Sequence, residues 1–256
     1  MTGATAIVTG AGSGIGQAVA RRLAVDDLHV LCVDVNGTGA KATADGIQAD
    51  GLAATACEAD VTVAADCARA CAQAAAIGQL RVLCNIAGIS PFGTGIGQVG
   101  EDLWDLVMAV NVKSVYLMSR ACLPHMSPME RTSVIVNMAS VHAFVAMPES
   151  APYAASKGAI VALTRQMAVD LAPAGIRVVA VAPGAVDTPS SHAGAAALGK
   201  ELADLFPADT DHLGWLGQPG DVAEAVAWLA SAAARFVNGA TLVADGGLLA
   251  GLRGQG

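Results

Sequence analysis

The feature that most constrains the fold is a set of short apolar runs, such as Val134–Val136 and Val178–Val181, in which consecutive residues are apolar. A strand of this kind is covered on both of its faces, as in a parallel sheet with helices on either side. Longer helical patterns separate these runs along the chain, which favours parallel strands joined by crossover helices. The sequence therefore predicts an α/β fold, a doubly wound parallel sheet of about seven strands with helices on both faces. We expect the strands at Thr5–Thr9, Val30–Val33, Ala53–Cys57, Arg81–Cys84, Ser133–Asn137, Arg177–Val181 and Thr241–Val243.

Nothing in the composition divides the chain of 256 residues, since it contains no low-complexity linker or internal repeat. We therefore predict that residues 1–256 form a single domain, a length that buries a sizeable core without disulfides or metals. Residues 189–217 differ from the rest, because Ser, His, Gly, Pro and Asp stand there among short apolar runs. Such a segment is typical of an insertion over a site, so we expect a substrate lid there.

The charge balance excludes several classes of partner. The chain has 14 Lys and Arg against 22 Asp and Glu, a formal net charge of −8. An acidic surface without a basic cluster repels phosphate backbones and anionic membranes, so neither nucleic acid nor a membrane is an expected partner. Gly, Pro or charge interrupts every apolar stretch before about 18 residues, so no transmembrane helix is predicted. The N-terminus lacks a secretion signal, which favours the cytoplasm, and the histidines lack metal-ligand spacing, so no metal is predicted.

A glycine-rich turn follows the first predicted strand and precedes an amphipathic helix. Its key members are Gly10, Ser13, Gly14, Ile15 and Gly16. Strand, glycine turn and helix N-terminus form the outline of a dinucleotide site, because the backbone can approach a pyrophosphate and the helix start supplies partial positive charge. The spacing departs from the usual G-x-G-x-x-G pattern, and ordinary tight turns also use glycine. The position directly after a first strand favours the nucleotide interpretation.

Asp34 closes the second predicted strand, about twenty residues beyond the turn. A carboxylate at this position accepts hydrogen bonds from the adenosine ribose hydroxyls and repels a 2′-phosphate. Neither Ser13 nor Val35 nor Asn36 supplies a positive charge nearby. The expected cofactor is therefore NAD(H) and not NADP(H), and the alternative is a solvated Asp at a strand end.

Tyr153 and Lys157 are four residues apart in a predicted helix from about Ala151 to Leu171, so both lie on one face. A free phenol has a pKa of about 10 and is a poor base at neutral pH unless a cation favours the phenolate. Lys157 is that cation. The pair alone is common on surface helices, and its weight comes from Ser140, which follows a buried strand where such a sheet places catalytic groups.

Taken in order, these motifs resemble the short-chain dehydrogenase/reductase family, whose single-domain form has a Rossmann-like fold. The resemblance covers essentially the whole chain. Besides the residues above it rests on Asp60-Val61, Asn85-Ile86-Ala87-Gly88, Asn111, Pro183-Gly184 through Thr188, and Asp245-Gly246-Gly247. Two departures are visible: Ile86 replaces a common Asn, with the expected loss of a structural hydrogen bond, and Ala244 stands where Val is frequent.

The resemblance implies roles for individual residues. Tyr153 would be the general acid/base, Ser140 would donate to the substrate oxygen, Lys157 would also bind the nicotinamide ribose, and Asn111 would position a water relay to Lys157. Asp60 would contact the adenine, and Pro183 through Thr188 would hold the nicotinamide end. The implied cofactor-binding set is Gly10, Ser13, Gly14, Ile15, Gly16, Asp34, Asp60, Val61, Asn85, Ala87, Gly88, Tyr153, Lys157, Pro183, Gly184, Val186 and Thr188.

We therefore expect an oxidoreductase that transfers a hydride between NAD(H) and a secondary alcohol or ketone. Segments near the catalytic residues are similar to bacterial glucose dehydrogenases of the family, which favours a small sugar, a polyol or a cyclic alcohol. Phe92, His142, Phe144 and Trp215 are candidates to line the substrate site. A 3-oxoacyl-type reductase and a non-catalytic NAD-binding regulatory scaffold stay open as alternatives. The apolar C-terminal helix and the resemblance predict a homo-oligomer, specifically a tetramer.

Overall fold

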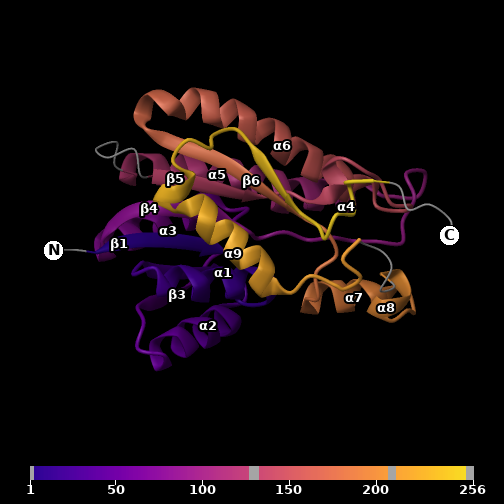
Figure 1. Cartoon of the computed structure of the whole chain (residues 1–256), viewed down its shortest axis with the longest axis horizontal. Coiled ribbons are helices and arrows are strands. Elements are labelled where there is room, and N and C mark those ends of the chain that lie inside the picture. Colours follow the sequence, from indigo (N-terminus) through magenta and orange to yellow (C-terminus); the bar gives the residue numbers. More distant parts are fainter. Residues whose placement is uncertain (1–2, 127–132, 207–211, 252–256) are drawn as a thin grey trace.

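In the computed structural model, which describes residues 3–126, 133–206 and 212–251, one sheet organises the chain (Figure 1). Its seven strands are all parallel and lie in the order β3-β2-β1-β4-β5-β6-β7. Every strand expected from the sequence is present, so the predicted Rossmann-like α/β fold is confirmed. The strands are β1 (Ala4–Thr9), β2 (His29–Asp34), β3 (Ala54–Glu58), β4 (Gln79–Asn85), β5 (Ser133–Met138), β6 (Ile176–Pro183) and β7 (Thr241–Ala244).

The strand order reverses at the centre of the sheet. β1 pairs with β2 on one side and with β4 on the other, so successive strands are added outward in opposite directions from β1. In open parallel sheets, ligands bind beyond the carboxyl ends of the strands at such a reversal. Thr9, Asp34 and Asn85 end these three strands. They therefore lie at the edge of the sheet where a ligand is expected.

Helices cover both faces of the sheet, and each face has its own buried apolar cluster. The first cluster lies under α1 (Gly14–Val25), α2 (Gly37–Ala49) and α9 (Pro219–Ala230). The second lies under α3 (Ala64–Ile77), α5 (Ser114–Cys122) and α6 (Ala151–Leu171).

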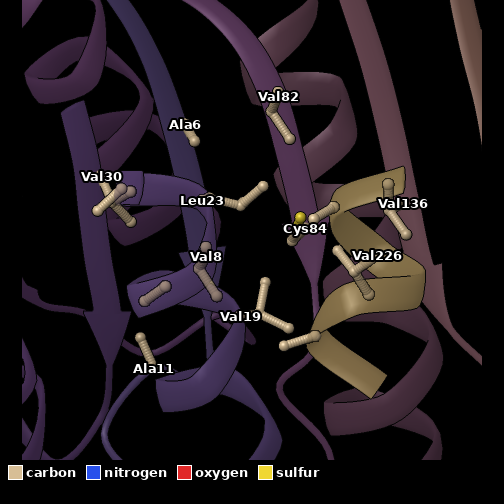
Figure 2. Close-up of a cluster of buried hydrophobic side chains, with 14 of the residues drawn as sticks. Ala6, Val8, Ala11, Val19, Leu23, Val30, Val82, Cys84, Val136 and Val226 are labelled. Carbon is tan, nitrogen blue, oxygen red and sulfur yellow. The ribbon is translucent and has the colours of Figure 1, made fainter. Parts of the chain in front are cut away.

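The first cluster shows how the helices meet the strands. Figure 2 shows Val19 and Leu23 of α1 and Val226 of α9 beside the strand residues Val8 and Cys84. With helices on both faces, β5 and β6 are buried at every residue. This double burial explains why their apolar runs do not alternate with polar residues.

A continuous helical run links β4 to β5. It contains α4 (Glu101–Met108), the π-helical turn η1 (Ala109–Lys113), α5 and a final turn at Leu123–His125. By length and composition this run could cross a membrane. The sequence predicted no transmembrane helix because charged residues and Gly or Pro interrupt every apolar stretch, but the mean hydropathy of this run is still high. Its α5 part buries Leu117 and Met118 in the second cluster. We therefore interpret it as a core helix.

The predicted lid, residues 189–217, contains α7 (Pro189–Ala197) and α8 (Leu202–Leu205). Both helices lie beyond one end of the sheet in Figure 1, while residues 207–211 lie outside the described residues. The segment returns to the sheet at Gly217, which forms a parallel bridge with Val186. The Asp187 N–H donates to the Gly217 carbonyl at 2.8 Å. The lid function and the single-domain organisation stay predictions.

Candidate active site

The glycine-rich turn has a backbone that larger residues could not adopt. Gly10 has φ +67°, and a Cβ there would lie 2.9 Å from the Cα of Ala87. A Cβ on Gly16 would meet the carbonyl oxygen of Gly10, so the first turn of α1 packs directly on the loop. Ser13 is the N-cap of α1, with extended backbone and no capping bond from its side chain. The free N–H groups at this helix start fit the pyrophosphate of a dinucleotide.

Thr9 joins the ends of β1 and β4 beneath this turn. Its Oγ1 accepts hydrogen bonds from the N–H groups of Ile86 at 3.0 Å and Ala87 at 3.1 Å. The side chain of Ile86 packs against the first apolar cluster. Ile86, which stands where Asn is common, thus contributes apolar packing, and its backbone N–H keeps the hydrogen bond to Thr9. Sequence analysis missed Thr9, whose signal is a lone hydroxyl at the end of an apolar strand.

Buried amides connect the strand ends further along the sheet. Asn85 is 5% exposed and donates through Nδ2 to Oδ1 of Asn137 at 2.9 Å. Asn137 in turn donates to Oγ1 of Thr164 on α6 at 3.0 Å. These bonds hold β4, β5 and α6 in register beside the site, which agrees with the supporting role expected for residues 85–88.

Asp34 bends toward the glycine turn. One carboxylate oxygen accepts from the N–H of Gly12 and the other from the N–H of Asn36, both at 2.8 Å. Within the described part of the chain it forms no ion pair. The carboxylate is therefore fixed at the end of β2 with its charge unneutralised. Asp60 follows β3 and accepts from the N–H and hydroxyl of Thr62 at 2.8 and 2.7 Å, while its neighbour Val61 is buried.

Ser140 and Tyr153 meet at the carboxyl end of β5. Ser140 follows β5 and begins the short helix Val141–Ala143, and Tyr153 lies in the first turn of α6. The Ser140 hydroxyl lies close enough to the Tyr153 phenol to favour its ionised form. Ser140 Oγ accepts the N–H of His142 at 3.2 Å. Because this bond uses a lone pair, the single O–H of Ser140 can donate either to the phenolate of Tyr153 or to a substrate oxygen.

Lys157 lies one helical turn after Tyr153 and is 4% exposed. Its Nζ donates to the carbonyl of Met138 at 2.8 Å and lies 5.4 Å from the centroid of the Tyr153 ring. Burial lowers the pKa of Lys157 to about 8. Burial raises the pKa of Tyr153, and the Ser140 hydroxyl opposes that rise only in part. Desolvation therefore acts against the phenolate that Lys157 and the bound nicotinamide are expected to stabilise.

Asn111 occupies the π-helical turn η1 and is 1% exposed. Its side chain accepts from the N–H of Ile89 at 2.8 Å and donates to Oγ of Ser156 at 3.0 Å. A Cβ on Gly88 would lie 3.2 Å from Asn111 Oδ1 and 3.7 Å from Lys157 Nζ, so the glycine keeps the space between these two groups open. The water relay stays a prediction. Ser156 was missed, although a lone Ser beside Lys157 in an Ala-rich helix marks it.

The segment after β6 closes the site against the glycine turn. Thr188 caps α7, and its Cβ would be 3.5 Å from a Cβ on Gly14. A Cβ on Gly184 would lie 2.9 Å from the Cα of Asp245, so the Pro183-Gly184 turn packs on the chain after β7. Val186 is 9% exposed. Pro183 through Thr188 thus lie where a nicotinamide would follow from a pyrophosphate at the start of α1.

Known proteins are similar to this chain in sequence and in fold. A family model described as enoyl-(acyl carrier protein) reductase matches residues 10–249. The chain is 40% identical over 247 residues to 2-(S)-hydroxypropyl-CoM dehydrogenase 3 of Xanthobacter autotrophicus, with 95% of each chain covered. It is 36% identical over 255 residues to 3beta-hydroxysteroid dehydrogenase 1 of Eggerthella lenta, with 97% of this chain and 94% of that one covered. The chain belongs to the short-chain dehydrogenase/reductase family.

A solved structure of the same family has the same fold. The crystal structure of 3-ketoacyl-(acyl-carrier-protein) reductase from Brucella melitensis complexed with NADH superposes with a TM-score of 0.85. It is 37% identical in sequence, and the match covers 95% of this chain and 97% of that one. The protein is therefore an NAD(P)-dependent short-chain dehydrogenase/reductase that acts on hydroxyl or keto substrates.

The substrate side of this dehydrogenase is bounded by aromatic residues from distant segments. Phe92 and His142 lie with their ring centroids 6.2 and 5.2 Å from that of Tyr153. Both were candidates from the sequence. Two other candidates, Phe144 and Trp215, are 49% and 59% exposed and make no ring contact with Tyr153 in the described residues. Among those residues, no group of three or more His, Cys, Asp or Glu could hold a metal.

Proposed function

We propose that the protein transfers a hydride between NAD(H) and a secondary alcohol or its ketone, with Tyr153 as general acid/base. The observation that carries this proposal is the convergence of Ser140, Tyr153 and the buried amine of Lys157 at the carboxyl end of β5, where Lys157 Nζ lies 5.4 Å from the centroid of the Tyr153 ring. A proton acceptor, a donor for the substrate oxygen and a cation thus converge beyond β5. These are the groups that alcohol oxidation requires.

Each residue has a part in the reaction. In oxidation Tyr153 accepts the hydroxyl proton of the alcohol, while Ser140 donates a hydrogen bond to the same oxygen. Lys157 favours the phenolate through its charge and donates to the nicotinamide ribose. Bound NAD+ supplies the hydride acceptor and a second positive charge, which offsets the desolvation that raises the pKa of Tyr153. In reduction Tyr153 returns the proton to the developing alkoxide.

Asp34 supports a preference for NAD(H) over NADP(H). Its two oxygens are held by backbone N–H groups at the end of β2, and no described cation pairs with them. A 2′-phosphate at this position would face an unneutralised carboxylate, a juxtaposition that costs several kcal/mol. The NADH in the related reductase structure points the same way.

For the substrate we propose a small hydroxylated or cyclic secondary alcohol, such as a polyol, a sugar or a cyclic alcohol. The support is the mixed surroundings of Tyr153, where the apolar ring of Phe92 and the imidazole of His142 both lie nearby. A 3-oxoacyl-type reductase is the second candidate. It is favoured by the names of the matching family model and of the related solved structure, both of which concern acyl carrier protein.

The decisive experiment is an NAD+ reduction screen at one pH against sugars, polyols, cyclic secondary alcohols and hydroxyacyl thioesters. We expect the highest kcat/KM with a hydroxylated or cyclic alcohol. A clear preference for the thioesters supports the second candidate instead. Failure of every alcohol and thioester, together with intact NADH binding, supports the regulatory scaffold and refutes catalysis.

We also propose a homotetramer in the cytoplasm. Support for self-association comes from large apolar side chains that are exposed in the monomer, among them Leu106 at 51%, Tyr116 at 48% and Val169 at 71%. We infer that these side chains contact further copies of the chain. Sedimentation velocity of the purified protein tests the oligomer, and a monomer at micromolar concentration refutes it.

A further inference from the structure

His142 contacts both Tyr153 and Ser140 of the candidate catalytic site. Its ring packs edge-on to Tyr153 at 5.2 Å between centroids, and its backbone N–H donates to Ser140 Oγ at 3.2 Å. The backbone bond is independent of the side chain. The imidazole therefore lies beside Tyr153, and the hydrogen bond to Ser140 does not depend on it.

The hydrogen bonds around His142 determine which ring nitrogen carries the proton. Ser150 Oγ donates its O–H to the carbonyl of Met147 at 3.1 Å, and the same oxygen lies 3.5 Å from Nδ1 of His142. The structure directs the Ser150 proton to Met147, so Nδ1 is assigned as the donor in the contact between the two residues. In a neutral imidazole this leaves Nε2 as an acceptor.

The ring is neutral at physiological pH. Burial lowers the pKa of His142, and the positive charge of Lys157 lowers it further. In the described residues Nε2 has no hydrogen-bond partner. An imidazole acceptor without a protein partner therefore lies beside the phenol that exchanges the substrate proton.

An apolar ring lies next to this imidazole. The ring of Phe92 lies 6.2 Å from the rings of both Tyr153 and His142, so the three rings form one cluster. Phe92 is in turn backed by the lid helix, because a Cβ on Gly194 would lie 3.2 Å from it. A substrate at Tyr153 thus has a hydrocarbon surface and an imidazole acceptor side by side.

We propose that His142 is a specificity-determining residue whose Nε2 accepts a hydrogen bond from a second hydroxyl group of the substrate. This inference rests on the proposed alcohol dehydrogenase function and narrows its substrate class to compounds with a free hydroxyl near the reacting carbinol, such as cyclic diols or polyols. The second group must be a donor, since Nε2 offers no proton. The hydride and proton steps at the reacting carbon are unchanged.

The test compares three classes of alcohol in the NAD+ reduction assay. These are cyclohexanol, the 1,2- and 1,3-cyclohexanediols, and the mono-methyl ethers of the two diols. We expect at least one diol to exceed both cyclohexanol and its own ether about tenfold in kcat/KM, mainly through KM, because only the diol can donate to Nε2. His142→Phe keeps an aromatic ring against Tyr153 but removes the acceptor. It should abolish this advantage while changing kcat/KM for cyclohexanol less than about threefold.

Two further variants make the result specific. His142→Gln supplies an amide oxygen as acceptor and should restore most of the diol advantage, whereas the exposed His125→Phe should leave it unchanged. An equal loss for diol and cyclohexanol in His142→Phe overturns the proposal, as does a wild-type protein that prefers the ether, cyclohexanol or a hydroxyacyl thioester. Those results leave the hydride chemistry intact. The proposed function itself fails if Tyr153→Phe keeps wild-type turnover, or if no alcohol and no thioester is turned over.

Discussion

The two halves of the active site are built by different means. On the cofactor side, β1, the glycine turn and α1 hold the site through backbone packing, where a Cβ on Gly10 or Gly16 has no room. On the substrate side, Phe92, His142 and Tyr153 come from three separate segments and meet only through their side chains.

This difference determines which residues of each half can be substituted. A backbone site accepts almost no substitution at its glycines, so one cofactor geometry is fixed by spacing along a short stretch of sequence. A site made of side chains from distant loops can vary residue by residue around a constant scaffold. The cofactor side is therefore common to the family, whereas the residues on the substrate side determine which substrate each member takes.

The largest expected effect separates chemistry from binding. Tyr153→Phe removes only the phenolic hydroxyl group, so turnover should fall about 10³-fold while NADH affinity stays within about threefold. Steady-state kinetics and fluorescence titration of NADH measure the two quantities. Tyr116→Phe is the matched control, because that phenol is 48% exposed on α5 and should leave both unchanged. Near-normal turnover in Tyr153→Phe would place the acid/base elsewhere.

The next largest effect is expected from a substitution in the glycine turn on the cofactor side. Gly16→Ala introduces a Cβ against the Gly10 carbonyl, and overpacking of this kind costs about 1–3 kcal/mol. The loop must shift, so NADH affinity should fall about tenfold to 100-fold. Gly220→Ala is the control, since that exposed position in α9 has nothing within 4 Å. Unaltered NADH binding in Gly16→Ala would mean that the close packing of α1 on the turn is not needed.

The two halves also differ in how far the sequence predicts them. The strands, the glycine turn and the Tyr153/Lys157 spacing were all predicted, because each is a local pattern with a fixed period or offset. The contact of Phe92 with Tyr153 brings together residues sixty-one positions apart, and no local pattern encodes it. The rise in the pKa of Tyr153 was also missed, because desolvation depends on everything packed around the phenol.

A charge reversal at Asp34 changes the electrostatics of the cofactor side, and it also removes the hydrogen bonds that the carboxylate accepts from the N–H groups of Gly12 and Asn36. Wild type should bind NAD+ about 100-fold more tightly than NADP+, since the Asp34 carboxylate faces the 2′-position. Asp34→Arg should narrow that ratio to within about tenfold, while Asp45→Arg, an exposed carboxylate on α2, should not alter it. Parallel fluorescence titrations with NAD+ and NADP+ measure the ratio. Equal affinities in the wild type would refute the role of Asp34.

The smallest expected effect joins the two halves at Lys157, which belongs to both. Burial lowers its pKa to about 8, so the free protein loses the ammonium charge as the pH rises through that value. The charged amine makes the stronger hydrogen bond to a ribose hydroxyl, so NAD+ affinity should be highest below pH 8 and fall about threefold to fivefold by pH 9.5. Lys157→Met should bind NAD+ more weakly and with no such pH dependence, whereas Lys41→Met on the exposed face of α2 should keep the wild-type profile. If the wild-type affinity stays constant between pH 7 and 9.5, the amine does not contact the cofactor as a cation, and Lys157 then serves only the phenol of Tyr153.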